Sequence, residues 1–208
     1  MAKTRRNLAK VPEHNLCVYC GSGSGKNPAY MAAARALGLA MASSGIGLVY
    51  GGGSLGLMGE VAKTVLEAGG YVTGIIPSFL GTKERMLTGV NDLVVTKNMH
   101  ERKMTMFERS TGFVALPGGI GTLEELTEIS TWAQLDQHAK PIILCNIENY
   151  WEPYLTLLKH MRAENFIREG MEFKMDVVKT AADVVPAFEF RLANSHEKVP
   201  LERMREVL

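Results

Sequence analysis

The sequence predicts a single α/β domain built on a doubly wound parallel sheet. Short apolar segments rich in β-prone residues alternate with longer segments of helical periodicity, which is typical of strands joined by crossover helices. The short segments are apolar almost throughout, as expected of strands that helices cover on both faces. A length of 208 residues suits one such domain, and the chain contains no internal repeat. The expected architecture is therefore Rossmann-like.

The positions of these segments give the expected elements. In a parallel sheet of this class, ligands bind in loops that follow the carboxyl ends of the strands. Those loops are therefore where a functional site should lie. Strands are expected at residues 16–20, 46–50, 71–77, 92–96, 112–116 and 141–145, and helices at residues 28–43, 57–68, 101–109, 122–137 and 150–164.

The two ends of the chain are expected to lie outside this domain, which should cover residues 15–190. Residues 1–14 are basic and lack the apolar core of a secretory signal, so we expect a flexible, solvated arm, with a transit peptide as the alternative. A short amphipathic helix is expected at 183–190. Residues 191–208 should form a tail that ends in a helix, because Pro200 suits a first helical turn.

The composition excludes several classes of protein. Hydrophobic residues make up 46% and charged residues 22% of the chain, as in soluble globular proteins. The net charge of +1 provides no overall field that would attract nucleic acid or an anionic membrane. No apolar stretch approaches the ~20 residues of a membrane-spanning helix. We therefore expect a cytoplasmic protein without nucleic-acid or membrane partners.

The three cysteines are too few for a disulfide framework and favour a reducing compartment. Cys17 and Cys20 share an expected strand, and residues three apart on a strand point to opposite faces. They should therefore be buried structural residues rather than a disulfide or a metal pair. His100 does not begin a zinc motif of the H-E-x-x-H type, because Met104 stands four residues later. No other group of side chains has metal-ligand spacing, so no metal is expected.

Two glycine clusters resemble nucleotide-binding motifs only in part. Residues 21–27 fail the P-loop pattern, which requires a glycine at Cys20 and a hydroxyl at Asn27. Residues 51–56 match G-x-G-x-x-G, which leaves a nicotinamide-dependent oxidoreductase as an alternative. The following strand ends in Ile76 and Pro77 without the carboxylate that this fingerprint requires. Close approach of the backbone to a smaller ligand is favoured, and no cofactor is expected.

The third cluster, residues 117–122, joins an expected strand to an expected helix. Free N–H groups and the positive end of the helix dipole make such a helix start an anion site. The glycines would let an oxyanion approach the backbone, and the Thr122 hydroxyl would add a donor. The alternative is a tight turn in which Thr122 only caps the helix.

Glu125 lies in the first turn of this helix and shares a face with Ile129 and Trp132. A carboxylate at the head of an apolar stripe is either a paired core residue or a functional acid. Glu124 and Glu128 lie on neighbouring faces, where they would interact favourably with the helix dipole or simply be charged side chains exposed to solvent.

Two cations, Arg102 and Lys103, follow another expected strand, so they should emerge at the same end of the sheet as Glu125. A guanidinium and an ammonium there would neutralise a phosphate or a developing anion. The alternative is an ordinary amphipathic helix start.

Four segments in this order resemble the LONELY GUY (LOG) family of cytokinin-activating nucleoside 5′-monophosphate phosphoribohydrolases. They are CGS at 20–22, VYGGGSLGLMG at 49–59, MHERK at 99–103 and PGGIGTLEE at 117–125, and the likeness extends over residues 16–187. Residues 78–90, which include Glu84, are less typical of the family. Many relatives were long labelled lysine decarboxylases, a label that we do not adopt because no lysine has the context of a pyridoxal-phosphate site.

The resemblance implies hydrolysis of the N-glycosidic bond of a purine nucleoside 5′-monophosphate, either AMP or an N6-modified cytokinin nucleotide. The products would be free base and ribose 5-phosphate, and neither metal nor cofactor would take part. It also implies a homodimer or higher homo-oligomer with sites near the interface. A nucleotide or molybdenum-cofactor carrier without turnover is the alternative. Arg102 and Glu125 occupy the catalytic positions, and the substrate-binding positions are Glu84, Lys103, Gly118, Gly119, Gly121, Thr122, Glu124 and Thr131.

Overall fold

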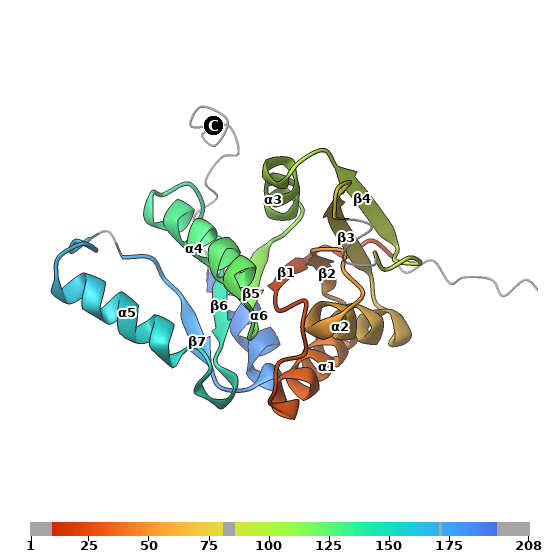
Figure 1. Ribbon diagram of the computed structural model, residues 1–208, viewed down its shortest axis with the longest axis horizontal. Coiled ribbons are helices and arrows are strands. Elements are labelled where there is room, and N and C mark those ends of the chain that lie inside the picture. Colours follow the sequence, from red (N-terminus) through yellow and green to blue (C-terminus); the bar gives the residue numbers. More distant parts are fainter. Residues whose placement is uncertain (1–9, 81–85, 171, 195–208) are drawn as a thin grey trace, which may run out of the picture.

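The computed structural model describes residues 10–80, 86–170 and 172–194 of the chain. Within these ranges, parallel strands form one sheet in the order β4-β3-β2-β1-β5-β6-β7, with helices on both faces (Figure 1). The expected doubly wound α/β fold is therefore confirmed. Glu84, most of the basic arm and the helix expected from Pro200 onward lie outside the described residues.

Every strand and helix that the sequence predicts between residues 15 and 164 is present, with bounds shifted by a few residues. The strands are β1 (Asn15–Tyr19), β2 (Gly47–Tyr50), β3 (Val72–Pro77), β4 (Asp92–Thr96), β5 (Gly112–Ala115), β6 (Ile142–Cys145) and β7 (Asp176–Val178). The helices are α1 (Pro28–Ser43), α2 (Gly56–Glu67), α3 (Met99–Glu108), α4 (Ile120–Gln134), α5 (Glu152–Ala163) and α6 (Val184–Asn194), with short 3₁₀ turns η1 (Ile147–Asn149) and η2 (Ala181–Asp183).

The two largest differences lie near the C-terminal end of the described chain. The edge strand β7 was not expected, because three residues carry too little alternation to be recognised. Helix α6 continues past the expected end at residue 190 as far as Asn194. Arg191 explains this extension, since its guanidinium forms two hydrogen bonds with the Asp176 carboxylate of β7. The last turn of α6 is thereby fastened to the edge of the sheet.

Two apolar cores lie on opposite faces of the sheet. Helices α1, α2 and α6 pack on one face, and α3, α4 and α5 pack on the other. Cys17 belongs to the second core and Cys20 to the first, as their spacing on the strand predicts. These two cysteines and Cys145 are buried free thiols.

The strand order places a topological switch point between β1 and β5. From β1 the chain runs outward through β2, β3 and β4, and α3 then returns it to β5 on the other side of β1. Helix α1 follows β1 on one face, while α4 follows β5 on the opposite face. Their connecting loops therefore diverge at the carboxyl ends of two neighbouring strands, which is where open sheets of this class bind ligands.

His138 lies buried between α4 and β6 in its neutral form. Its Nε2 lies 2.8 Å from the Ile129 carbonyl oxygen, and its Nδ1 accepts a hydrogen bond from the Lys140 backbone N–H. Burial and, to a smaller extent, the Lys140 charge outweigh the opposing effect of the Ile129 carbonyl and together lower the pKa of His138 from 6.5 to about 4. Protonation would place a new N–H against the Lys140 N–H donor.

Acidification is therefore expected to destabilise the fold through His138. Between pH 6.5 and 4 the unfolded chain binds a proton at this residue and the folded chain does not, so stability is lost as the pH falls through this window. The pKa difference corresponds to roughly 3 kcal/mol of unfolding free energy. Urea denaturation across this range should show a flatter pH dependence for His138→Gln than for wild type. His160→Gln, at an exposed position, serves as the control; equal slopes for wild type and His138→Gln would contradict the prediction.

Candidate active site

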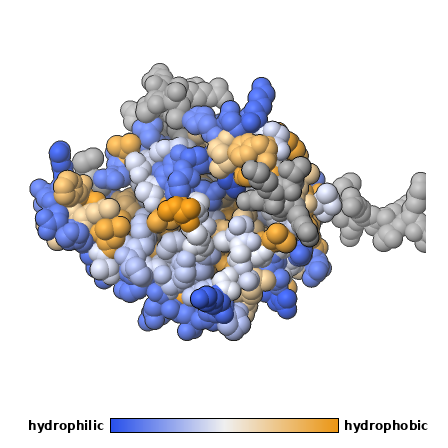
Figure 2. Space-filling view, in the orientation of Figure 1, coloured by the Kyte–Doolittle hydropathy of each residue, from blue (hydrophilic) through white to orange (hydrophobic). Residues whose placement is uncertain are grey.

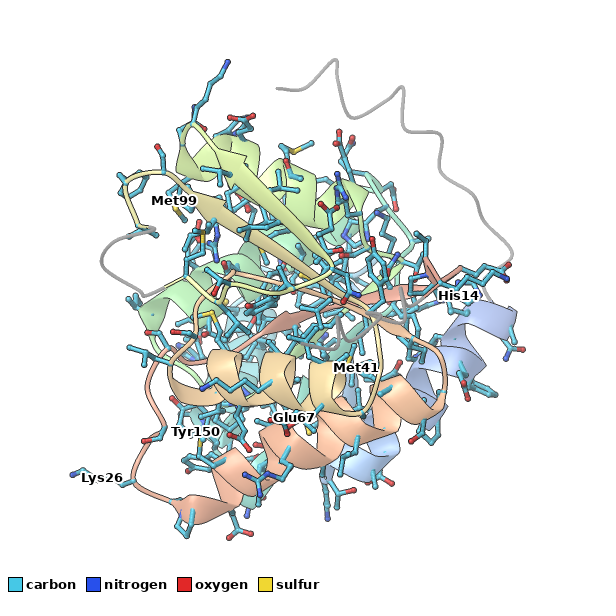
Figure 3. All side chains as sticks on the ribbon, turned by 90° about the vertical axis from the view of Figure 1, so that its right-hand side faces the viewer. His14, Lys26, Met41, Glu67, Met99 and Tyr150 are labelled. Atoms are coloured by element: carbon cyan, nitrogen blue, oxygen red, sulfur yellow. The ribbon has the colours of Figure 1, made fainter. Side chains whose placement is uncertain are left out.

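A cavity of about 350 Å³ opens at the carboxyl ends of the strands, beside the switch point. Loops that follow five strands, β1 through β5, contribute to it. Figure 3 shows Lys26, Met99 and Tyr150 at this end of the molecule and His14, which precedes β1, at the opposite end. The lining residues are Val18, Cys20, Gly21, Ser22, Gly51, Met58, Leu80, Met99, Arg102, Gly119, Ile120, Gly121, Thr122, Glu124 and Glu125.

Arg102 and Glu125 form a buried ion pair in the wall of this cavity. Arg102 Nη1 donates to Glu125 Oε1 at 2.8 Å, and Arg102 Nε donates to the Ile75 carbonyl oxygen within β3 at 3.3 Å. Arg102 reaches this position because Asn98 caps α3, its side chain accepting a hydrogen bond from the Glu101 N–H. The predicted convergence of these two residues is thus confirmed, although they lie 23 positions apart in the sequence.

Burial raises the pKa of the Glu125 carboxyl above its usual 4.5, and the charge and hydrogen bond of Arg102 oppose this rise. The pair therefore holds a carboxylate in a poorly solvated place where its charge would act strongly on a bound ligand. A carboxylate at a cavity wall, fixed by one cation and otherwise open to the cavity, can stabilise a developing positive charge.

Gly51 makes room for this arrangement. A Cβ atom at Gly51 would overlap Arg102 Nη2 and would also press against Met58 Sδ. The first glycine of the second cluster therefore allows the guanidinium to pass close to the backbone after β2.

Gly51→Ala is accordingly expected to impair the site severely. The new methyl group would displace the Arg102 guanidinium and break its alignment with Glu125, so any activity that depends on the pair should fall at least tenfold, with a small loss of stability. Gly23→Ala is the matched control, because a Cβ there meets nothing within 4 Å. The measurement is the rate of base release described below; wild-type rates for Gly51→Ala would contradict the prediction.

The other glycines of the second cluster serve the packing of the chain. Gly56 has a positive φ of 57°, and a Cβ there would overlap the backbone of Ser22 in the loop after β1. A Cβ at Gly59 would overlap the Ser54 backbone. The loop after β1 thus packs directly on Gly56, and its Gly23 and Gly21 carbonyl oxygens accept the Leu57 and Met58 N–H groups that a dinucleotide pyrophosphate would need at the start of α2. This observation weighs against the nicotinamide alternative.

The third glycine cluster forms the start of α4. The helix begins at Ile120, and its N-cap is Gly119, which provides no side-chain hydrogen bond. Thr122 therefore lies inside the first turn and is not the cap that the alternative interpretation expected. Its hydroxyl lies against Gly118, where a Cβ would overlap it. Gly119 and Gly121 border open space, because a Cβ at either would meet nothing within 4 Å. This helix start thus offers uncapped N–H donors to an anion.

Lys103 does not line the cavity. Its Nζ donates to Glu124 Oε1 at 2.7 Å and to Glu128 Oε1 at 2.8 Å, which links α3 to α4 beside the buried pair. Burial works to lower the pKa of the Lys103 amine, but these two carboxylates outweigh it and raise the pKa. Glu124 lines the cavity as well as binding Lys103. The sequence correctly predicted that Arg102 and Lys103 lie at this end of the sheet. It did not predict that the two cations bind different carboxylates.

Thr131 lies on the exposed side of α4, outside this cavity. Its hydroxyl donates to the Thr127 carbonyl oxygen within the helix. Several lining residues were not singled out from the sequence, among them Ser22, Met58, Leu80 and Met99. Ser22 and Met58 belong to glycine-rich segments that had been noted, and Met99 begins the MHERK segment, whereas no pattern marked Leu80.

Two kinds of feature are absent from the described part of the chain. There, no group of three or more His, Cys, Asp or Glu side chains has a geometry that could hold a metal ion. In the same ranges, no helix combines the length and the apolar character that crossing a bilayer requires.

Comparison with known proteins identifies close sequence relatives. A probable cytokinin riboside 5′-monophosphate phosphoribohydrolase, LOGL1 of Oryza sativa subsp. japonica, is 42% identical over 184 residues, which cover 88% of this chain and 82% of the relative. LOG3 of Arabidopsis thaliana, named a cytokinin riboside 5′-monophosphate phosphoribohydrolase, is 41% identical over 93% of this chain and 89% of the relative. The rice protein LOG is 43% identical over 82% of this chain and 70% of its own length.

Solved structures and a family model extend the comparison. The Moco carrier protein of Chlamydomonas reinhardtii superposes with a TM-score of 0.64 at 23% identity, covering 86% of this chain and 98% of that chain. At this identity the likeness shows the fold alone. The family model described as "Possible lysine decarboxylase" matches residues 58–188; among the described residues that line the cavity, none is a lysine. With relatives above 40% identity over most of its length, the chain belongs to the LONELY GUY (LOG) family.

Proposed function

We propose that this protein hydrolyses the N-glycosidic bond of a purine nucleoside 5′-monophosphate, AMP or an N6-modified cytokinin nucleotide, to free base and ribose 5-phosphate. The observation that carries the proposal is the buried Arg102–Glu125 pair, which shares one cavity with the uncapped start of α4. An anion site beside a fixed carboxylate suits a nucleoside 5′-monophosphate, in which one ribose separates the phosphate from the reacting carbon, C1′. The names of the relatives with more than 40% identity support the same activity.

In this mechanism the 5′-phosphate binds at the start of α4. Gly119 and Gly121 leave space for the oxyanions, Gly118 shapes the turn, and Thr122 supplies a hydroxyl donor beside the N–H groups. Binding energy from the phosphate would hold the ribose in register with Glu125, so that nucleosides without a phosphate should react poorly.

Glu125 and Arg102 then act on the glycosidic bond. Breaking the bond between C1′ and the purine N9 develops positive charge on the ribose, which the Glu125 carboxylate stabilises. Glu125 either activates a water molecule as a general base or attacks C1′ to form a glycosyl ester that water hydrolyses. Arg102 holds the carboxylate in place and assists departure of the base. The step requires neither metal nor cofactor.

The remaining substrate-binding positions fit this scheme in different ways. Glu124 lines the cavity and can reach the ligand directly, while Lys103 holds Glu124 by its ion pair. Thr131 lies outside the cavity of its own chain and would reach a substrate only across a subunit interface. Glu84, which lies outside the described residues, completes the proposed set.

A homo-oligomer is part of the proposal. Two apolar side chains are exposed at the ends of α4, Ile120 at its first residue (82%) and Leu135 at its C-cap (51%). Figure 2 shows an apolar patch amid mostly polar surface near the centre of the face on which α4 begins. Sedimentation should give at least twice the chain mass of 22.8 kDa.

We also propose a cytoplasmic location, which suits three buried free thiols.

The deciding experiment measures base release by chromatography from AMP and from isopentenyladenosine monophosphate, with both nucleosides as controls. Release from a monophosphate but not from its nucleoside would support the proposal, and the faster monophosphate would define the substrate class. Ready turnover of the nucleosides would contradict the phosphate-binding role of the α4 start. Tight binding of a monophosphate without release would instead favour a carrier.

A further inference from the structure

Tyr150 connects three of the loops at the carboxyl ends of the strands. It follows β6, and its hydroxyl donates a hydrogen bond to the carbonyl oxygen of Gly118, in the turn between β5 and α4. Its ring meets the Tyr30 ring of α1 edge-on, with centroids 5.4 Å apart. Tyr30 in turn covers Gly25 of the loop after β1, where a Cβ would lie only 2.8 Å from the Tyr30 ring. Tyr150 itself does not line the cavity.

The backbone that presents Tyr150 is strained. The two preceding residues, Glu148 and Asn149, have positive φ angles of 50° and 58°, although neither is glycine. Such conformations are unfavourable for residues other than glycine and persist only where the surroundings impose them. Here Asn146 does so, because its side-chain oxygen accepts from the Trp151 N–H at 2.7 Å and its carbonyl accepts from the Asn149 N–H at 3.2 Å.

The hydrogen bond from Tyr150 fixes the orientation of one peptide group in the proposed phosphate site. The peptide between Gly118 and Gly119 is planar and trans, so its C=O and N–H point in opposite directions. With the carbonyl held toward Tyr150, the N–H of Gly119 is directed away from Tyr150. Gly119 is both the N-cap of α4 and a lining residue of the cavity. Glycines stand on both sides of this peptide, so no side chain of its own restricts its rotation.

We propose that Tyr150 is a positioning residue that aims the Gly119 N–H at the 5′-phosphate of the substrate. The strained turn after β6 serves to bring the hydroxyl to the Gly118 carbonyl. Without that hydroxyl the Gly118–Gly119 peptide can rotate and the start of α4 loses one aligned donor. This inference rests on the proposed function, since it assigns a phosphate ligand to the turn.

The test compares Tyr150→Phe with Tyr30→Phe. Each variant loses one hydroxyl and keeps its ring, and in the described part of the chain the Tyr30 hydroxyl makes no hydrogen bond, so Tyr30→Phe is the matched control. Calorimetry with ribose 5-phosphate should show about tenfold weaker binding for Tyr150→Phe, because the Gly119 N–H would no longer donate a hydrogen bond to the charged phosphate. KM for AMP should rise by a similar factor with little change in kcat, and Tyr30→Phe should match wild type in both measurements.

Other results would overturn the inference. Wild-type affinity of Tyr150→Phe for ribose 5-phosphate would show that the hydroxyl does not align the donor. An equal loss of affinity for adenosine, or a fall in Tm that accounts for the lost binding, would show a general structural role. Ribose 5-phosphate binding does not require turnover. If wild type released no base yet bound ribose 5-phosphate in a Tyr150-dependent way, the proposed hydrolysis would fail and the positioning role would stand.

Discussion

Glu125→Gln is expected to abolish base release while the fold and the phosphate site stay nearly intact. The amide keeps the size of the carboxylate, and its oxygen can still accept from Arg102, but it carries no charge to stabilise the ribose cation and cannot serve as base or nucleophile. We expect turnover of the monophosphate to fall by about 1,000-fold or more, because such electrostatic and proton-transfer contributions are large in a buried site.

The measurement is base release under single-turnover conditions, together with ribose 5-phosphate affinity. Glu128→Gln is the matched control, since Glu128 lies on the same helix, binds Lys103 and does not line the cavity. It should retain most of the wild-type rate. Wild-type turnover by Glu125→Gln would make Glu125 a structural residue and the mechanism wrong.

The pH dependence of the wild-type reaction should reflect the titration of the Glu125 carboxyl. Burial raises the pKa of Glu125 above 4.5, although Arg102 limits the rise. The reaction requires the ionised form, so kcat/KM should fall as the pH drops through this raised pKa, with an acid limb above pH 4.5. The substrate phosphate itself titrates at about pH 6, so the pH dependence of ribose 5-phosphate binding is measured separately and divided out of the profile. An acid limb below pH 4.5 would show that Arg102, rather than burial, dominates at this site.

Much of the fold could be predicted because its signals are local. Apolar strands separated by helical periodicity fix a parallel α/β sheet, and each expected element between residues 15 and 164 is present. Strand β7 could not be found in this way, since its three residues gain their structure only by pairing with β6. Likewise, the contact of Arg191 with Asp176 that extends α6 is a tertiary interaction.

The site shows the same division between local and tertiary information. Glu125 and Arg102 could be brought together because both follow strands whose ends meet at one side of the sheet. Adjacent residues on a helix point about 100° apart, however, and the sequence did not show that Arg102 faces the cavity while Lys103 faces Glu124 and Glu128. Tyr150 was missed for a related reason. Its bond to Gly118 joins residues 32 positions apart, and no motif marks either partner for the other.

Arg102→Met should lower both activity and stability, and the two losses have separable causes. Methionine fills much of the space of the arginine stem but leaves the Glu125 carboxylate buried without its cation. Breaking a buried pair from one side typically costs about 3–5 kcal/mol, so urea denaturation at pH 7 should show a loss of this order. Base release should fall severely as well, because Glu125 would no longer be oriented.

The double variant Arg102→Met/Glu125→Gln distinguishes catalysis from an ion pair that only stabilises the fold. Removing the carboxylate charge as well should restore most of the lost stability, because no buried charge stays unpaired, while base release should remain absent. In the Arg102→Met variant the pKa of Glu125 should rise further, so the contribution of this carboxyl to stability should be greatest at low pH and should be lost as the pH rises through that pKa. Recovery of activity with stability in the double variant would show that the pair acts only through the fold. A stable but inactive double variant requires that the charges themselves carry out the reaction.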